Sequence, residues 1–204
     1  MRLKFPEDEQ KQAVLLDAYA VIDEGISLAI REDGRGLACR KGCGNCCRQS
    51  DIPVYPHELA GIYRYSAEKL KGPTREVLKG RLKGPIGGCL FLMEDSCLIH
   101  PVRPASCRQF NVFGKPCEEG EDPFFTRRQD VLTPKREYTL RAFSLVASFY
   151  GIGSADPLAA EEIIHTRALN LREFDRQGLA RLMERHGPER PNNPLSGHDP
   201  LSGH

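Results

Sequence analysis

The sequence predicts a mainly α-helical fold that contains one small β-hairpin. Apolar residues recur at helical spacing over most of the chain, glycine–proline pairs separate these segments, and a short apolar stretch near residue 90 lacks that spacing. The chain has 204 residues, of which 40% are hydrophobic and 28% charged. These values are typical of a single compact domain with an ordinary core.

Each predicted helix is bounded by a recognisable signal. Val14, Leu15, Ala18 and Ile22 line one face of the first, which the glycines after residue 33 end. Pro56 begins the second, and glycine–proline pairs end the second and third. The helices are expected at residues 8–31, 56–70, 75–82, 138–150, 157–169 and 171–186, with a brief turn that carries Cys107 and Arg108.

The predicted hairpin pairs residues 87–92 with 97–99 around a turn at 93–96. Residues 114–134, rich in charge, proline and glycine, are expected to form an ordered loop. We expect one domain over residues 1–186, with a metal-binding core at about 36–118 and C-terminal helices at 138–186. Residues 187–204 end in a five-residue repeat without an apolar pattern and predict a disordered tail.

The charge balance limits the classes of partner. Basic and acidic side chains number 29 and 28, for a net charge of +1, so neither a nucleic acid nor a membrane surface is expected. The charged N-terminus is not followed by the apolar region of a secretory signal, so the expected compartment is the cytoplasm.

The cysteines carry the functional signal. All eight lie between residues 39 and 117, namely Cys39, Cys43, Cys46, Cys47, Cys89, Cys97, Cys107 and Cys117. Two or three residues between thiols can aim the sulfurs at one ion, and Gly42 and Gly44 permit the turn. Zinc and iron–sulfur clusters both take thiolate ligands, and eight cysteines could fill two four-ligand sites. Iron or an iron–sulfur cluster is the preferred interpretation, with zinc as the alternative.

The neighbouring charges suit thiolates. An ion held by four thiolates carries excess negative charge, which Arg40, Lys41, Arg48, Arg103 and Arg108 could offset. His100 follows Cys97 closely, and both a ligand role and a packed, hydrogen-bonded role remain open for it. Four disulfides are the competing interpretation of the cysteines, but the expected compartment and the adjacency of Cys46 and Cys47 argue against them.

The combined motif resembles a known family. Cys39-x3-Cys43-x2-Cys46-Cys47, Gly88-Cys89-Leu90 and Cys97-x-Ile99-His100-Pro101-x-Arg103-Pro104-x2-Cys107-Arg108 are similar to the YkgJ-type cysteine-cluster family, described as a zinc- or iron-chelating domain. The flagellin lysine methylases of bacteria have a similar cysteine pattern. The resemblance spans residues 36–118 and implies that the first seven cysteines are ligands, whereas Cys117 lies beyond the matched motif.

Two activities suggested by these patterns are not carried over. The chain lacks the G-x-G-x-x-G fingerprint of a dinucleotide or S-adenosylmethionine site, so methylase activity is not expected. The first three cysteines also have the spacing of the radical S-adenosylmethionine enzymes, but they follow a helix and precede no alternation of strands and helices.

The sequence thus predicts a metal-binding protein with one or two cysteine-ligated sites for iron, an iron–sulfur cluster or zinc. An iron-dependent or iron–sulfur enzyme with an unknown substrate is the alternative, and its catalytic residues are unknown. Metal ions are the expected ligands, while a protein partner or a small substrate is left open.

Overall fold

The structure, a computed structural model, describes residues 9–48, 52–85, 87–152, 156–171 and 173–186. Helices dominate and one short hairpin is present, so the predicted fold class is confirmed. The α-helices are α1 (Glu9–Asp33), α2 (Asn45–Arg48), α3 (Pro56–Glu68), α4 (Gly72–Lys83), α5 (Ala105–Gln109), α6 (Pro123–Thr126), α7 (Arg136–Val146), α8 (Pro157–His165) and α9 (Arg176–Arg185). The remaining elements are the 3-10 helices η1 (His100–Val102), η2 (Arg128–Asp130) and η3 (Ala147–Tyr150) and the strands β1 (Pro53–Val54), β2 (Leu92–Met93), β3 (Ser96–Cys97) and β4 (Leu169–Asn170).

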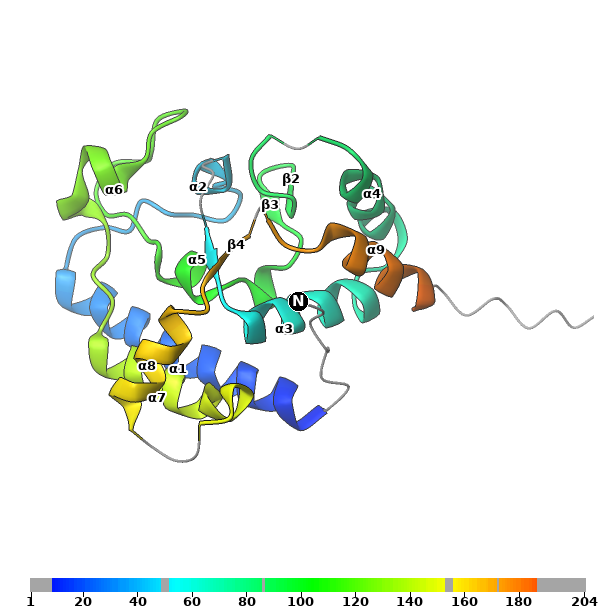
Figure 1. Ribbon diagram of the computed structural model, residues 1–204. Helices are drawn as coiled ribbons and strands as arrows, with labels where there is room; N and C mark the ends of the chain where they lie inside the picture. The colour runs from blue at the N-terminus through cyan, green and yellow to red at the C-terminus, as the bar shows by residue number, and fades with distance from the viewer. Residues whose placement is uncertain (1–8, 49–51, 86, 153–155, 172, 187–204) are drawn as a thin grey trace, which may run out of the picture.

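The longer helices form the base of the molecule. Helix α7 packs along α1 and also against α8, while α3 contacts both α1 and α9, and α4 packs on α9. In Figure 1 the cysteine-bearing elements α2, β3 and α5, together with β2, lie on the opposite side of α3 from α7. The helical base therefore supports the segments in which the cysteines are concentrated.

One continuous core of buried apolar side chains joins the helices. Leu59, Ile62 and Tyr63, which share the apolar face of α3, are each 0% exposed. Helices α1 and α7 approach closely at Gly25, where a Cβ atom would lie 2.7 Å from Cβ of Tyr138. Burial of this kind is what the amphipathic spacing predicted.

The hairpin is shorter than predicted. Strands β2 and β3 contain two residues each and pair in antiparallel register, with Leu92 opposite Cys97. The turn is formed by Glu94 and Asp95, whose φ angles of 45° and 60° match those of a tight two-residue hairpin turn. Cys89 does not extend β2, because its amide donates to the Cys47 carbonyl and its carbonyl accepts from the Leu92 amide, whereas the Phe91 carbonyl still accepts from the Leu98 amide across the hairpin.

A second two-stranded sheet was not predicted. Strands β1 and β4 pair in antiparallel register, with Pro53 opposite Asn170 and Val54 opposite Leu169. Strands of two residues are too short to show an alternating pattern, and these two come from distant parts of the chain.

The C-terminal helices are also shorter than predicted. The helix expected at 157–169 ends at His165, and the one expected at 171–186 begins at Arg176. Asp175 caps the latter, since its carboxylate accepts a hydrogen bond from the Gly178 amide at 2.8 Å. The other predicted helices agree with α1, α3, α4, α5 and α7–η3 to within a few residues.

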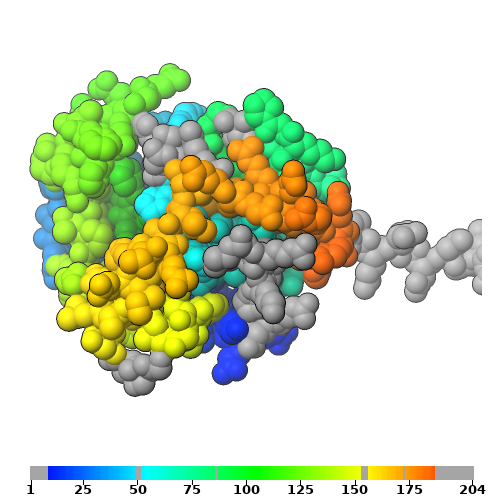
Figure 2. Space-filling view, in the orientation of Figure 1, coloured from blue at the N-terminus to red at the C-terminus, as the bar shows by residue number. Residues whose placement is uncertain are grey.

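The expected loop at 114–134 contains the short helices α6 and η2. Within the described ranges, none of the helices has both the length and the apolar character needed to cross a bilayer. Figure 2 shows the segment from α8 to α9 running across one face of the molecule. The predicted tail at 187–204 lies outside the described residues.

Candidate metal centre

Backbone contacts place the first cysteine. Leu37 forms a β-bridge with Phe113, and the Ala38 amide donates a hydrogen bond to the Val112 carbonyl at 2.7 Å. The Val112 amide donates in turn to the sulfur of Cys39 at 3.3 Å. The loop that follows α1 is thereby fixed to the segment that precedes α6.

Two glycines shape the rest of this loop in different ways. Gly42 has a φ of 79°, the left-handed conformation that the spacing predicted. Gly44 is required for space, because a Cβ atom there would lie 2.9 Å from Cδ1 of Leu92 in the hairpin. The loop therefore approaches the hairpin closely just before α2, which carries two adjacent cysteines.

The second cysteine group meets the first through its backbone. The Cys89 amide donates to the Cys47 carbonyl at 2.7 Å. Gly88, with a φ of 82°, permits this contact, because a Cβ atom there would lie 2.9 Å from the same carbonyl oxygen. The thiol of Cys47 hydrogen-bonds to the sulfurs of Cys46 and Cys89, so three sulfurs are neighbours.

Two further cysteines join these three sulfurs. Cys97 lies on β3, and Cys107 lies on α5. The charges of Cys46 and Cys89 both act on Cys97 and on Cys107. Together, Cys46, Cys47, Cys89, Cys97 and Cys107 are called the inner cysteines below.

Hydrogen bonding and burial shift the pKa values of the inner cysteines, some downward and others upward. Hydrogen bonds from the Cys47 thiol lower the pKa of Cys46 and that of Cys89 to about 7, and they raise the pKa of Cys47 itself. Burial raises the pKa of Cys97 to about 11 and also raises the pKa of Cys107, and repulsion from neighbouring thiolates adds to both. A bound cation would stabilise all these thiolates at once, so the donor set fits a metal ion.

Three outer cysteines extend the group. Cys39 interacts electrostatically with Cys43 and Cys46, and Cys117 interacts with Cys39 and Cys43. Burial raises the pKa of both Cys39 and Cys117. The Asn45 side chain donates to the Cys117 carbonyl at 2.8 Å and so ties this segment to α2. All eight predicted cysteines thus belong to one connected group, with Cys46 between its inner and outer parts.

His100 lies apart from this group. Its side chain is exposed, and in the described part of the chain the charged groups that act on it are Arg103, Arg108 and Asp23. Partial burial and the two arginines lower its pKa. The exposure of His100 does not match the packed role predicted for it, and the ligand role stays a prediction.

The five basic residues predicted to offset the thiolates have different surroundings. Arg40 and Lys41 are exposed, and Arg48 pairs with Asp95 at 2.5 Å. Arg103, in contrast, lowers the pKa of cysteines from three separate segments. These are Cys39, Cys46 and Cys97.

A buried charged network, which the sequence analysis did not identify, holds α5 and its cysteine. Glu58 is 1% exposed and accepts hydrogen bonds from the amides of Ala105 at 2.7 Å and Tyr55 at 2.9 Å. Burial raises the pKa of Glu58 to about 7. Arg108 pairs with Asp23 of α1 at 2.7 Å. Glu58 lies in the first turn of α3 and forms part of its capping box, and the sequence analysis did not predict its burial.

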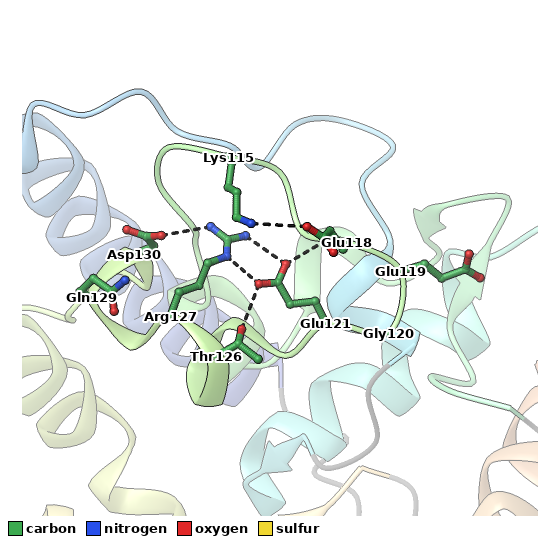
Figure 3. A pocket seen from close by; sticks show the side chains of 9 residues that line it. All are labelled: Lys115, Glu118, Glu119, Gly120, Glu121, Thr126, Arg127, Gln129 and Asp130. Carbon is green, nitrogen blue, oxygen red and sulfur yellow. Dashed lines mark hydrogen bonds and ion pairs between the residues drawn. The ribbon is translucent and has the colours of Figure 1, made fainter.

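A charged cavity of about 630 Å³ lies next to the outer cysteines. Figure 3 shows Arg127 between Glu121, at 2.7 Å, and Asp130, at 3.3 Å. The same guanidinium donates to the sulfur of Cys117 at 3.7 Å and holds the pKa of Glu121 at about 2. The cavity lining comprises Lys115, Glu118, Glu119, Gly120, Glu121, Thr126, Arg127, Gln129 and Asp130.

A second cavity, of about 380 Å³, opens beside Cys89, and its lining includes Arg48, Arg81, Glu94 and Asp95. Cys89, one of the inner cysteines, therefore lies at the wall of an accessible cavity.

The cysteine side chains interact with one another, but their sulfurs are not directed at a common point. Within the described ranges, no three Cys, His, Asp or Glu side chains are arranged to hold a metal ion. The inner thiols hydrogen-bond to one another instead, and metal binding would turn their sulfurs toward a common ion.

One comparison with known protein families finds a similarity over the cysteine-bearing segment. Residues 38–131 match the family model CxxCxxCC, described as a "putative zinc- or iron-chelating domain". This match agrees with the resemblance that the motifs indicated, and it includes Cys117, which lay beyond the predicted motif. In this chain three residues, not two, separate the first two cysteines of the cluster. No curated protein and no solved structure matches the chain.

Proposed function

We propose that this protein binds metal through the inner cysteines, with iron or an iron–sulfur cluster as the preferred occupant and zinc as the alternative. The observation that carries the proposal is that Cys47, Cys97 and Cys107 each interact with both Cys46 and Cys89, in a segment that matches a zinc- or iron-chelating domain. Thiolates are the ligands that both kinds of centre prefer. The outer cysteines provide the donors for a second ion or for exchange with the first.

Metal analysis of protein purified without oxygen tests the proposal. Iron, acid-labile sulfide and a broad absorbance near about 400 nm would support an iron–sulfur centre, because thiolate-ligated clusters absorb there. A colourless protein with one or two zinc ions per chain would support zinc. Protein that contains neither iron nor zinc would refute the proposal.

Serine substitutions locate the centre. Cys46→Ser and Cys89→Ser should each lose most of the bound metal, because both sulfurs lie beside Cys47. Ser96→Ala is the matched control, since Ser96 is exposed and lies next to a cysteine on the same strand. Full metal content in both cysteine variants would place the centre elsewhere.

An enzymatic role is the second candidate, and the cavity beside Cys89 favours it. A catalytic metal site keeps one coordination position open, whereas a structural site is closed. Azide or cyanide added to the cobalt-substituted protein should change its visible spectrum if a position is open. An unchanged spectrum would favour the closed, non-catalytic site.

A further inference from the structure

Arg103 differs from the other arginines of the interior in what its side chain contacts. Arg75 and Arg127 are 3% and 6% exposed and bind backbone carbonyls and carboxylates, respectively. Arg108 pairs with Asp23. In the described part of the chain, Arg103 makes neither a side-chain hydrogen bond nor an ion pair, and its buried Nε has no acceptor.

The Arg103 side chain is half-buried, and its buried Nε–H group has lost contact with water without gaining an acceptor, which costs free energy. Native structures seldom leave such an atom unpaired, and an unpaired one indicates a missing partner. The partner of Arg103 should therefore be an anionic group that forms only in the metal-loaded protein.

The backbone keeps this side chain beside the cysteines. Pro104 restricts the preceding residue to extended conformations, and Arg103 adopts φ −60° and ψ 145°. The Arg103 carbonyl accepts a hydrogen bond from Nε of Arg108 at 3.0 Å. Its position is thus set by the same residues that hold α5, and its charge acts on cysteines of the first loop, α2 and β3.

We propose that Arg103 is the internal counter-ion of the cysteine centre and donates a hydrogen bond from Nε to a metal-bound sulfur. This role of Arg103 rests on the proposed function. Arg103 acts as a positioning residue that adjusts the affinity of the cysteine centre for metal. A divalent ion with four thiolates carries a charge of about −2, and one guanidinium at its edge offsets part of that charge. The hydrogen bond also lowers the donor strength of the sulfur that accepts it.

Three variants separate charge, hydrogen bonding and general structure. Arg103→Gln removes the charge, and Arg103→Lys keeps the charge but loses the planar Nε donor. Arg40→Gln is the matched control, because Arg40 also neighbours a cysteine in sequence and is exposed. The affinity of each protein for Co²⁺ and Zn²⁺ is measured by competition with a chromophoric chelator at one pH.

Arg103→Gln should bind both ions about 10–100-fold more weakly, the usual effect of removing a hydrogen-bond partner of a metal ligand. Arg103→Lys should fall between this variant and the wild type, and Arg40→Gln should remain within about twofold of the wild type. The sulfur-to-cobalt charge-transfer band should move to longer wavelength in Arg103→Gln, because the thiolate becomes a stronger donor. A purely structural role would not move this band.

Equal affinities and equal band positions in Arg103→Gln and Arg40→Gln would overturn the inference while leaving the proposed function intact. So would an equal fall in the melting temperature of the metal-free and metal-loaded Arg103→Gln protein, because the residue would then act on the fold alone. Wild-type protein that binds neither ion and contains no iron when purified without oxygen would refute the proposed function itself.

Discussion

Gly88→Ala should destabilise the protein at the junction of its two cysteine groups. Gly88 has a φ of 82°, and a Cβ atom there would lie 2.9 Å from the Cys47 carbonyl oxygen and 3.2 Å from Cα of Arg48. Both neighbours are backbone atoms, which cannot rotate away as a side chain would. The alanine variant must therefore separate α2 from the chain that carries Cys89.

The size of the effect follows from two contributions. The left-handed conformation costs a residue with a Cβ atom about 1–2 kcal/mol relative to glycine. Separation also weakens the 2.7 Å hydrogen bond from the Cys89 amide to the Cys47 carbonyl. Loss of such a bond costs about 1–2 kcal/mol when the groups stay partly buried. The free energy of unfolding should thus fall by about 2–4 kcal/mol.

Gly87→Ala provides the control. Gly87 precedes Gly88, its φ is not positive, and nothing lies within 4 Å of a Cβ atom built there. Urea denaturation of both variants should show the loss in Gly88→Ala and a change within about 0.5 kcal/mol in Gly87→Ala. Metal content per chain, measured on the same samples, should fall only in Gly88→Ala. Equal stability of the two variants would refute the claim that the two cysteine groups need this close approach.

Three other substitutions test the helical base. Burial raises the pKa of Glu58 from 4.5 to about 7, so wild-type stability should fall by about 3 kcal/mol as pH rises between these values. Glu58→Gln lacks this titration, so its difference from the wild type in urea denaturation should shrink over the same range, and a constant difference would contradict the assignment. Gly61→Ala should lower the free energy of unfolding by about 1–3 kcal/mol, because its Cβ would meet Leu15 of α1. Gly80→Ala, in open space, should stabilise α4 slightly, and similar melting temperatures for the two alanine variants would count against the packing argument.

Local patterns in the sequence were enough to predict the helical class and much of the core. Leu59, Ile62 and Tyr63 occupy one face of a helix, and all three are fully buried as their spacing predicted. Not every apolar residue of a helix is covered, since Leu145 of α7 is 43% exposed. Apolar spacing identifies a face and does not show how far the neighbouring elements cover it.

The candidate site, too, was predicted from the sequence only in part. The spacing of the cysteines and the glycines between them identified the group from residues alone, because short loops restrict where neighbouring thiols can point. Sequence alone did not distinguish Arg103 from the four other basic residues beside the cysteines. It also did not indicate that Cys117 is tied to α2 by Asn45 and to the acidic loop by Arg127.

The sequence by itself therefore determined the helical segments, the cysteine set and the class of chemistry that thiolates support. Only the tertiary structure decided the burial of Glu58, the unpaired position of Arg103 and the contact between Gly88 and Cys47. The physical reason is the separation along the chain over which each effect acts. Hydrophobic periodicity and loop spacing depend on residues only a few positions apart. Burial, ion pairing and backbone approach depend on segments far apart in sequence, which meet only when the helices pack.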